Sequence, residues 1–131
     1  MVFDKEFIWY EDHFVYHITT KENIESIIKH GLIPSLGERS LSKMDINKAI
    51  YFFDNINNFQ MWAELLYPNI DIKNLELLRF NLKRRKWYIH NGGEDFYLLN
   101  KVPPQKIQYL DDAGQINGLH ELNWKNLVLR N

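Results

Sequence analysis

Apolar and polar positions in the first part of the chain predict a strand that leads directly into a helix. Residues 14–18 form a short run rich in β-formers. Thr19 followed by Glu22 has the spacing of a capping box, which predicts a helix start at this point. The apolar face of that helix would consist of Ile24, Ile27 and Ile28. Gly31 follows and is suited to the left-handed conformation that ends many helices.

A second strand and helix are predicted after a polar stretch from Ser35 to Asn47, which lacks a clear period and suggests a loop. Residues 49–53 are apolar and aromatic, as expected for a strand. Either Asn55 or Asn57 is placed to cap the next helix. The apolar positions of that helix are Phe59, Met61, Trp62, Leu65 and Leu66.

The second half of the chain has the pattern of a β-rich segment. Strands are predicted over residues 75–82, 96–99, 107–110 and 126–129. Asn91-Gly92-Gly93 is a turn signal between them. Two early helices with many later strands predict an α+β fold, with a mostly antiparallel split β-sheet, in one domain over residues 1–131.

Composition narrows the classes of protein that this chain can belong to. Its 131 residues are 45% hydrophobic and 15% aromatic, and its formal net charge is −1. This balance fits a globular domain and lacks the overall basic excess of a dedicated nucleic-acid binder. The absence of cysteine excludes disulfides, a thiolate nucleophile and thiolate-bound zinc. With neither a secretory signal nor a membrane-length apolar run, a cytoplasmic protein is expected.

Common motifs for metal and phosphate chemistry are missing from the sequence. His13 and His17 have the i, i+4 spacing of helical zinc sites. In a strand, however, four residues span roughly 13 Å, which is too far for two ligands of one ion. Glycine-rich phosphate loops and a nucleophile elbow are also absent. We therefore expect no metal cofactor.

Three separated segments carry the clearest functional pattern. The first is His17-Ile18-Thr19 at the end of a predicted strand, and the second is Ala49-Ile50-Tyr51-Phe52, followed by a helix that contains Trp62. The third is Glu94-Asp95-Phe96, with Val102-Pro103-Pro104 further along. In this order the segments resemble the motifs of the ADP-ribosyltransferase superfamily, on the His-Tyr-Glu branch shared by diphtheria-type toxins and poly-ADP-ribose polymerases. The third is also similar to DarT-type DNA ADP-ribosyltransferases.

The resemblance implies an enzyme that uses NAD as a substrate. It would cleave the nicotinamide–ribose bond and transfer ADP-ribose to a macromolecular acceptor, which the sequence does not identify. By this resemblance His17 would bond the adenosine ribose, while Tyr51 and Trp62 would hold the nicotinamide. His17, Ile18 and Thr19 would form the NAD-binding strand end. A role as toxin, effector or phage-defence protein would fit such an activity.

The identity of the catalytic acid is left open between Glu94 and Asp95. Alignment on Phe96 selects Asp95, and the chemistry of the family selects Glu94. The two side chains would point to opposite faces of a strand, so only one could enter a shared cleft. Arg39, in the polar stretch before the second motif, could hold the pyrophosphate as a bidentate donor.

Two other functions are compatible with the sequence. The basic run Lys83, Arg84, Arg85 and Lys86 abuts Trp87 and Tyr88, which could bind a nucleic-acid backbone and stack bases. A solvated strand end or hairpin explains the same run. The chain could also be a non-catalytic module of the same fold that binds a protein or nucleic-acid partner.

Overall fold

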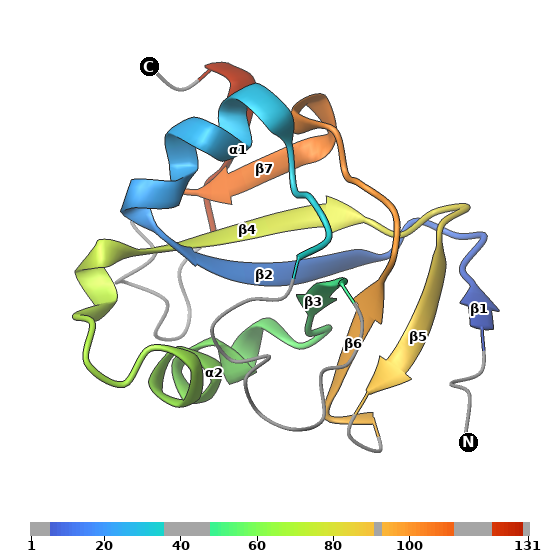
Figure 1. The fold of residues 1–131 in the computed structure, drawn as a ribbon, viewed down its shortest axis with the longest axis horizontal. Coiled ribbons are helices and arrows are strands. Elements are labelled where there is room, and N and C mark those ends of the chain that lie inside the picture. Colours follow the sequence, from blue (N-terminus) through green and yellow to red (C-terminus); the bar gives the residue numbers. More distant parts are fainter. Residues whose placement is uncertain (1–5, 36–47, 91–92, 112–121, 130–131) are drawn as a thin grey trace.

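A computed structural model describes residues 6–35, 48–90, 93–111 and 122–129, and it has the predicted α+β organisation (Figure 1). Its strands are β1 (Glu6–Ile8), β2 (Phe14–Thr20), β3 (Ile50–Phe52), β4 (Leu75–Asn81), β5 (Lys86–His90), β6 (Asp95–Leu98), β7 (Ile107–Leu110) and β8 (Trp124–Asn126). Its α-helices are α1 (Ile24–His30) and α2 (Phe59–Leu66). Short 3-10 turns precede both helices.

The strands form two four-stranded antiparallel sheets that meet at one point. The first sheet has the order β1-β5-β6-β3, and the second has the order β2-β4-β7-β8. The edge strands β2 and β3 are joined by an isolated bridge, in which Tyr16 and Phe53 exchange backbone hydrogen bonds of 2.8 and 3.0 Å. The predicted split β-sheet is therefore confirmed. In Figure 1, β2 and β4 cross the upper part of the molecule while β3, β6 and β5 run at a steep angle below them.

The second sheet is buried on both faces, which explains the nearly continuous apolar sequence of β4. Leu78 and Phe80 point into a cluster that also contains Ile24 and Ile27 of α1. Leu77, on the opposite face, packs in a second cluster with side chains of α2. Each helix thus covers one face of this sheet, as expected for a small domain built around two apolar layers.

The start of α1 differs from the sequence prediction. The predicted capping box is wrong, because Thr19 still belongs to β2 and neither helical turn has a side-chain cap. The Thr19 hydroxyl instead accepts a hydrogen bond of 3.2 Å from the Asn23 side chain. The helix ends at Gly31, as predicted, and the N–H of Gly31 donates to Ile27. Its φ of 78° is positive, but its ψ of −169° places it outside the left-handed helical conformation that was expected.

The structure confirms the predicted cap before the second helix and corrects the bounds of the last strand. Asn55 accepts a hydrogen bond from the N–H of Asn57 and so caps the turn before α2, as predicted. The last strand lies at Trp124–Asn126, and residues 127–129 form a 3-10 turn instead of the predicted strand. Leu127 is fully buried in this turn, which shows that its apolar run reflects burial and not a strand. The predicted 35–47 loop lies largely outside the described residues.

Candidate functional site

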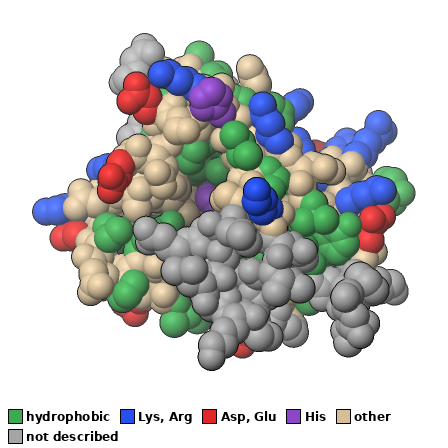
Figure 2. Space-filling view, viewed as in Figure 1, with side chains coloured by type: hydrophobic (Ala, Val, Ile, Leu, Met, Phe, Trp, Pro, Cys, Tyr) green, Lys and Arg blue, Asp and Glu red, His purple; other side chains and the backbone are tan. Residues whose placement is uncertain are grey.

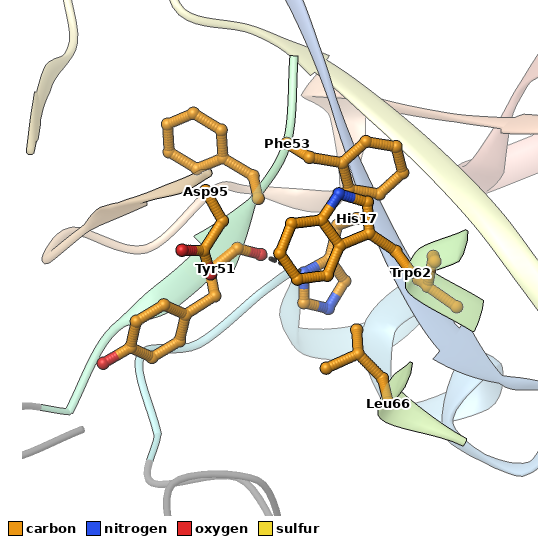
Figure 3. Close-up of a pocket in the computed structure, with 8 residues that line it drawn as sticks. His17, Tyr51, Phe53, Trp62, Leu66 and Asp95 are labelled. Carbon is orange, nitrogen blue, oxygen red and sulfur yellow. Dashed lines mark hydrogen bonds between the residues drawn. The ribbon is translucent and has the colours of Figure 1, made fainter. Parts of the chain in front are cut away.

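A narrow pocket lies where the two sheets meet. Its cavity volume is only about 10 Å³, so its own side chains nearly close it. The pocket is lined by His17, Ile18, Tyr51, Phe52, Phe53, Trp62, Leu66 and Asp95. These side chains come from β2, β3 with the residue after it, α2 and β6, so segments far apart in the sequence converge here. In Figure 3, Asp95 and Tyr51 lie on one side, and His17, Trp62 and Leu66 lie on the other.

His17 connects the two sheets across the junction. Its Nδ1 lies 2.7 Å from the backbone carbonyl oxygen of Tyr51. Because a carbonyl oxygen can only accept, Nδ1 carries the hydrogen and donates it. This bond fixes both the orientation of the imidazole and the tautomer of its neutral form, as is common where a histidine must present its second nitrogen in a defined direction.

Tyr51 is buried on β3 within an aromatic cluster. Its side chain is 6% exposed, and its ring lies 5.6 Å from that of Tyr97, its direct partner on β6. It also lies 5.0 Å from the imidazole of His90. Tyr51 therefore lines the pocket and also packs within the first sheet.

Trp62 supplies the ring that α2 presents to the junction. It is 8% exposed and stacks on Phe53 with ring centroids 6.2 Å apart. Its indole Nε1 is buried and finds no hydrogen-bond partner among the described residues. Since buried indole N–H groups usually have a partner, this donor is an exception within the described residues.

The two candidate acids lie in different surroundings. Asp95 is 5% exposed, opens β6 and lines the pocket. Glu94 is exposed in the turn before that strand and is not among the residues that line the pocket. Glu94 lies outside the strand, so the expected alternation within a strand is not what separates the two acids, and it is Asp95 that joins His17, Tyr51 and Trp62.

His90 is the residue of this region that the sequence did not single out. Its Nδ1 lies 2.7 Å from Oδ1 of Asp95, and the two side chains are 13% and 6% exposed. The residues face each other across β5 and β6. The sequence analysis predicted no strand over residues 86–90, so this cross-strand neighbour could not be identified from the chain alone.

Of the remaining residues predicted to bind NAD, only one lines the pocket. Ile18 is 4% exposed and lines the pocket, whereas Thr19 is equally buried but is absent from its lining. Arg39 lies outside the described residues.

The basic run connects β4 to the start of β5, and these strands lie in different sheets. It is therefore a strand end, and the alternative interpretation as a hairpin is wrong. Lys83 lies 3.9 Å from an oxygen of Asp12, and Lys86 lies 3.5 Å from an oxygen of Glu6. Burial lowers the pKa of Arg85, which is half-buried.

The aromatic residue that follows the run points away from a nucleic-acid surface. The Trp87 ring packs on Phe7 and Phe96 at 4.9 and 5.4 Å, so it serves the core and not a stacking platform. Figure 2 shows the Lys and Arg side chains of one face in several separate places, without one continuous basic surface.

The two histidines with zinc-like spacing have separate surroundings. The His13 ring packs on Trp9 at 4.2 Å, while His17 bonds to Tyr51. Over the described ranges, no three His, Asp or Glu side chains are grouped so that they could hold a metal ion. Nor does any helix in these ranges have the length and apolar character needed to cross a membrane.

Comparison with known proteins adds no relative to this description. No protein-family model matches the sequence, and a search of curated proteins finds no match.

Proposed function

We propose that the protein is an NAD-dependent mono-ADP-ribosyltransferase. It would cleave the nicotinamide–ribose bond of NAD and transfer ADP-ribose to a macromolecular acceptor in the cytoplasm. The observation that carries the proposal is the convergence of His17, Tyr51, Trp62 and Asp95 on one pocket. The motifs that suggested the family follow one another along the chain, but nothing in their order alone requires that their side chains meet.

The chemistry of NAD cleavage matches the residue types in this pocket. Loss of nicotinamide develops positive charge on the ribose, as in glycoside hydrolysis. A fixed carboxylate such as that of Asp95 stabilises this charge best in a site from which water is excluded. Aromatic rings such as Tyr51 and Trp62 hold a flat ring in an oriented pose, which lowers the entropic part of the barrier.

The size of the pocket limits what it could enclose. Pockets that bury drug-sized ligands typically have volumes of about 300–1,000 Å³, whereas this cavity has about 10 Å³, roughly the room that one water molecule needs. Entry of the nicotinamide ring would therefore require the lining side chains to move apart, and this ring is the only part of NAD that we propose to be enclosed. The ribose and pyrophosphate would lie outside, with Asp95 at the junction between the enclosed and the exposed parts.

One observation favours a second candidate, a non-catalytic module of the same fold. The pocket carboxylate belongs to an aspartate, which is one methylene shorter than the family's glutamate, and it is already bonded to His90. A carboxylate engaged in a structural pair would leave a domain that binds NAD or a partner without cleaving the glycosidic bond.

The test is turnover of NAD by the purified protein. NAD labelled in its adenylate half is incubated with the protein, with and without cell lysate, and released nicotinamide is measured by mass spectrometry. We expect nicotinamide release and, in lysate, label on a protein or nucleic acid that identifies the acceptor class. Asp95→Asn should abolish release without weakening NAD binding, and Glu94→Gln is the matched control that should retain activity.

Two results would contradict the enzyme proposal. Binding of NAD without release of nicotinamide in either condition would favour the non-catalytic module. Absence of both NAD binding and nicotinamide release would show that the pocket is not an NAD site.

A further inference from the structure

We infer that His90 is a positioning residue for the Asp95 carboxylate, which its ring N–H holds in a fixed orientation. The inference rests on the proposed function, because it assigns a role in the same reaction. It concerns a residue that neither the sequence pattern nor the family resemblance selects.

The hydrogen bond between the two residues is short and shielded from water. Nδ1 of His90 lies 2.7 Å from Oδ1 of Asp95, with side-chain exposures of 13% and 6%. Their Cα atoms are register partners in the antiparallel pairing of β5 and β6, so the backbone fixes both ends of the contact. In the ionised state a carboxylate oxygen only accepts, and Nδ1 is therefore the donor.

Aromatic packing holds the imidazole in this orientation. The His90 ring lies 5.0 Å from the Tyr51 ring at an interplanar angle of 58°, and 6.1 Å from the Tyr97 ring at 85°. Tyr97 is itself stacked on Tyr88, with centroids 5.0 Å apart. Asp95, Tyr51 and Tyr97 are the titratable groups of the described residues that face His90 in these contacts.

One consequence for the reaction follows from this geometry. A bond to one oxygen restrains rotation of the carboxylate and aims it at the developing charge on the ribose. A misplacement of about 1 Å can cost roughly 100-fold in rate.

A pair of variants tests this role. His90→Asn keeps a neutral N–H donor attached near the position of Nδ1, and His90→Leu has nearly the same shape without a donor. We would measure the kcat for nicotinamide release and the Kd for NAD for the wild-type protein and both variants. Thermal unfolding of each protein serves as the folding control.

The expected result is a loss of kcat of about 100-fold in His90→Leu with a nearly unchanged Kd for NAD. His90→Asn should retain kcat within about 10-fold near neutral pH, which corresponds to about 1.4 kcal/mol of transition-state stabilisation. A purely structural role for His90 would not produce a loss of kcat at an unchanged Kd that the conservative variant restores.

The inference is overturned if the wild-type protein releases nicotinamide and both variants match its kcat, and in that case the proposed function stands. If the wild-type protein releases no nicotinamide, the proposed function itself fails, and the role of His90 falls with it. If His90→Leu does not fold, His90→Gln takes its place: its amide lies one methylene further out than the position of Nδ1, so it should lose kcat at an unchanged Kd, and a kcat equal to that of the wild-type protein would overturn the inference.

Discussion

Gly31 is the position at which a single methyl group should disturb the fold most clearly. It ends α1 with a φ of 78° and a ψ of −169°, a region that is essentially confined to glycine. A Cβ atom added to Gly31 would lie 2.1 Å from the carbonyl oxygen of Val102 and 3.1 Å from Cα of Pro103. Both contacts are with backbone, which cannot rotate away as a flexible side chain would.

The cost of Gly31→Ala has two parts. Backbone strain in this region costs about 1–3 kcal/mol. To relieve the clash, the Val102 segment must move, and this strains the two backbone hydrogen bonds of 2.9 and 3.0 Å between Leu32 and Val102. Each such bond contributes about 1 kcal/mol net. We therefore expect the free energy of unfolding to fall by about 4 kcal/mol, a large part of the 5–15 kcal/mol typical of a domain.

Urea denaturation followed by tryptophan fluorescence measures this difference, and Gly93→Ala is the matched control. Gly93 also has a positive φ, of 101°, but a Cβ atom there meets no described atom within 4 Å. The control should therefore lose only the strain, about 1–2 kcal/mol. Equal losses for the two variants would refute the argument that the close approach of Val102 makes Gly31 necessary.

Three further predictions concern charges and rings outside the pocket. Burial raises the pKa of the Tyr16 phenol from its usual 10.0, with Arg79 acting in the opposite direction. The folded chain therefore holds this proton more tightly than the unfolded chain does. As a result, the free energy of unfolding should decrease as the pH rises above about 10. Urea titrations at several alkaline pH values should show a smaller decrease for Tyr16→Phe, and an unchanged slope would contradict this. The Arg79 guanidinium lies 4.1 Å from the Phe14 ring centroid and 4.4 Å from that of Trp124. A double-mutant cycle of Arg79→Met with Trp124→Leu should therefore give a coupling free energy of about 0.5–1 kcal/mol. Zero coupling would exclude a cation–π contribution. Finally, Lys83→Ala with Arg84→Ala should leave nicotinamide release unchanged and should not alter the salt dependence of binding to single-stranded DNA; a flattened salt dependence would restore the basic run as a nucleic-acid site.

The fold could be predicted from the sequence wherever burial produces a regular pattern. The strand at residues 75–82 and the helix with Ile24 and Ile27 bury side chains at regular intervals, and both are present. β5 was missed because its residues are only partly buried and it starts inside the basic run, so neither alternation nor an apolar run marks it. The capping box failed for a different reason. The pairing of Thr19 with Glu76 extends β2 beyond the point where local capping preferences would have ended it.

The sequence predicted several residues of the candidate site but not how their side chains are arranged. The order of the motifs identified His17, Tyr51 and Trp62, all of which line the pocket. Strand alternation predicted that only one of Glu94 and Asp95 could enter it. Asp95 is that residue, but the reason is that β6 begins at Asp95 and leaves Glu94 in the turn, and no local pattern encodes where the strand begins. His90 depends on the pairing of β5 with β6 and was invisible for the same reason.

The most direct test of the central claim is a crystal structure of Asp95→Asn grown with saturating NAD, since the slow variant should retain the intact dinucleotide. We predict the nicotinamide ring in the pocket lined by Tyr51 and Trp62, with the ribose carbon that bears it facing residue 95. NAD bound on another surface, or a pocket that remains closed by its own side chains in the presence of NAD, would contradict the account.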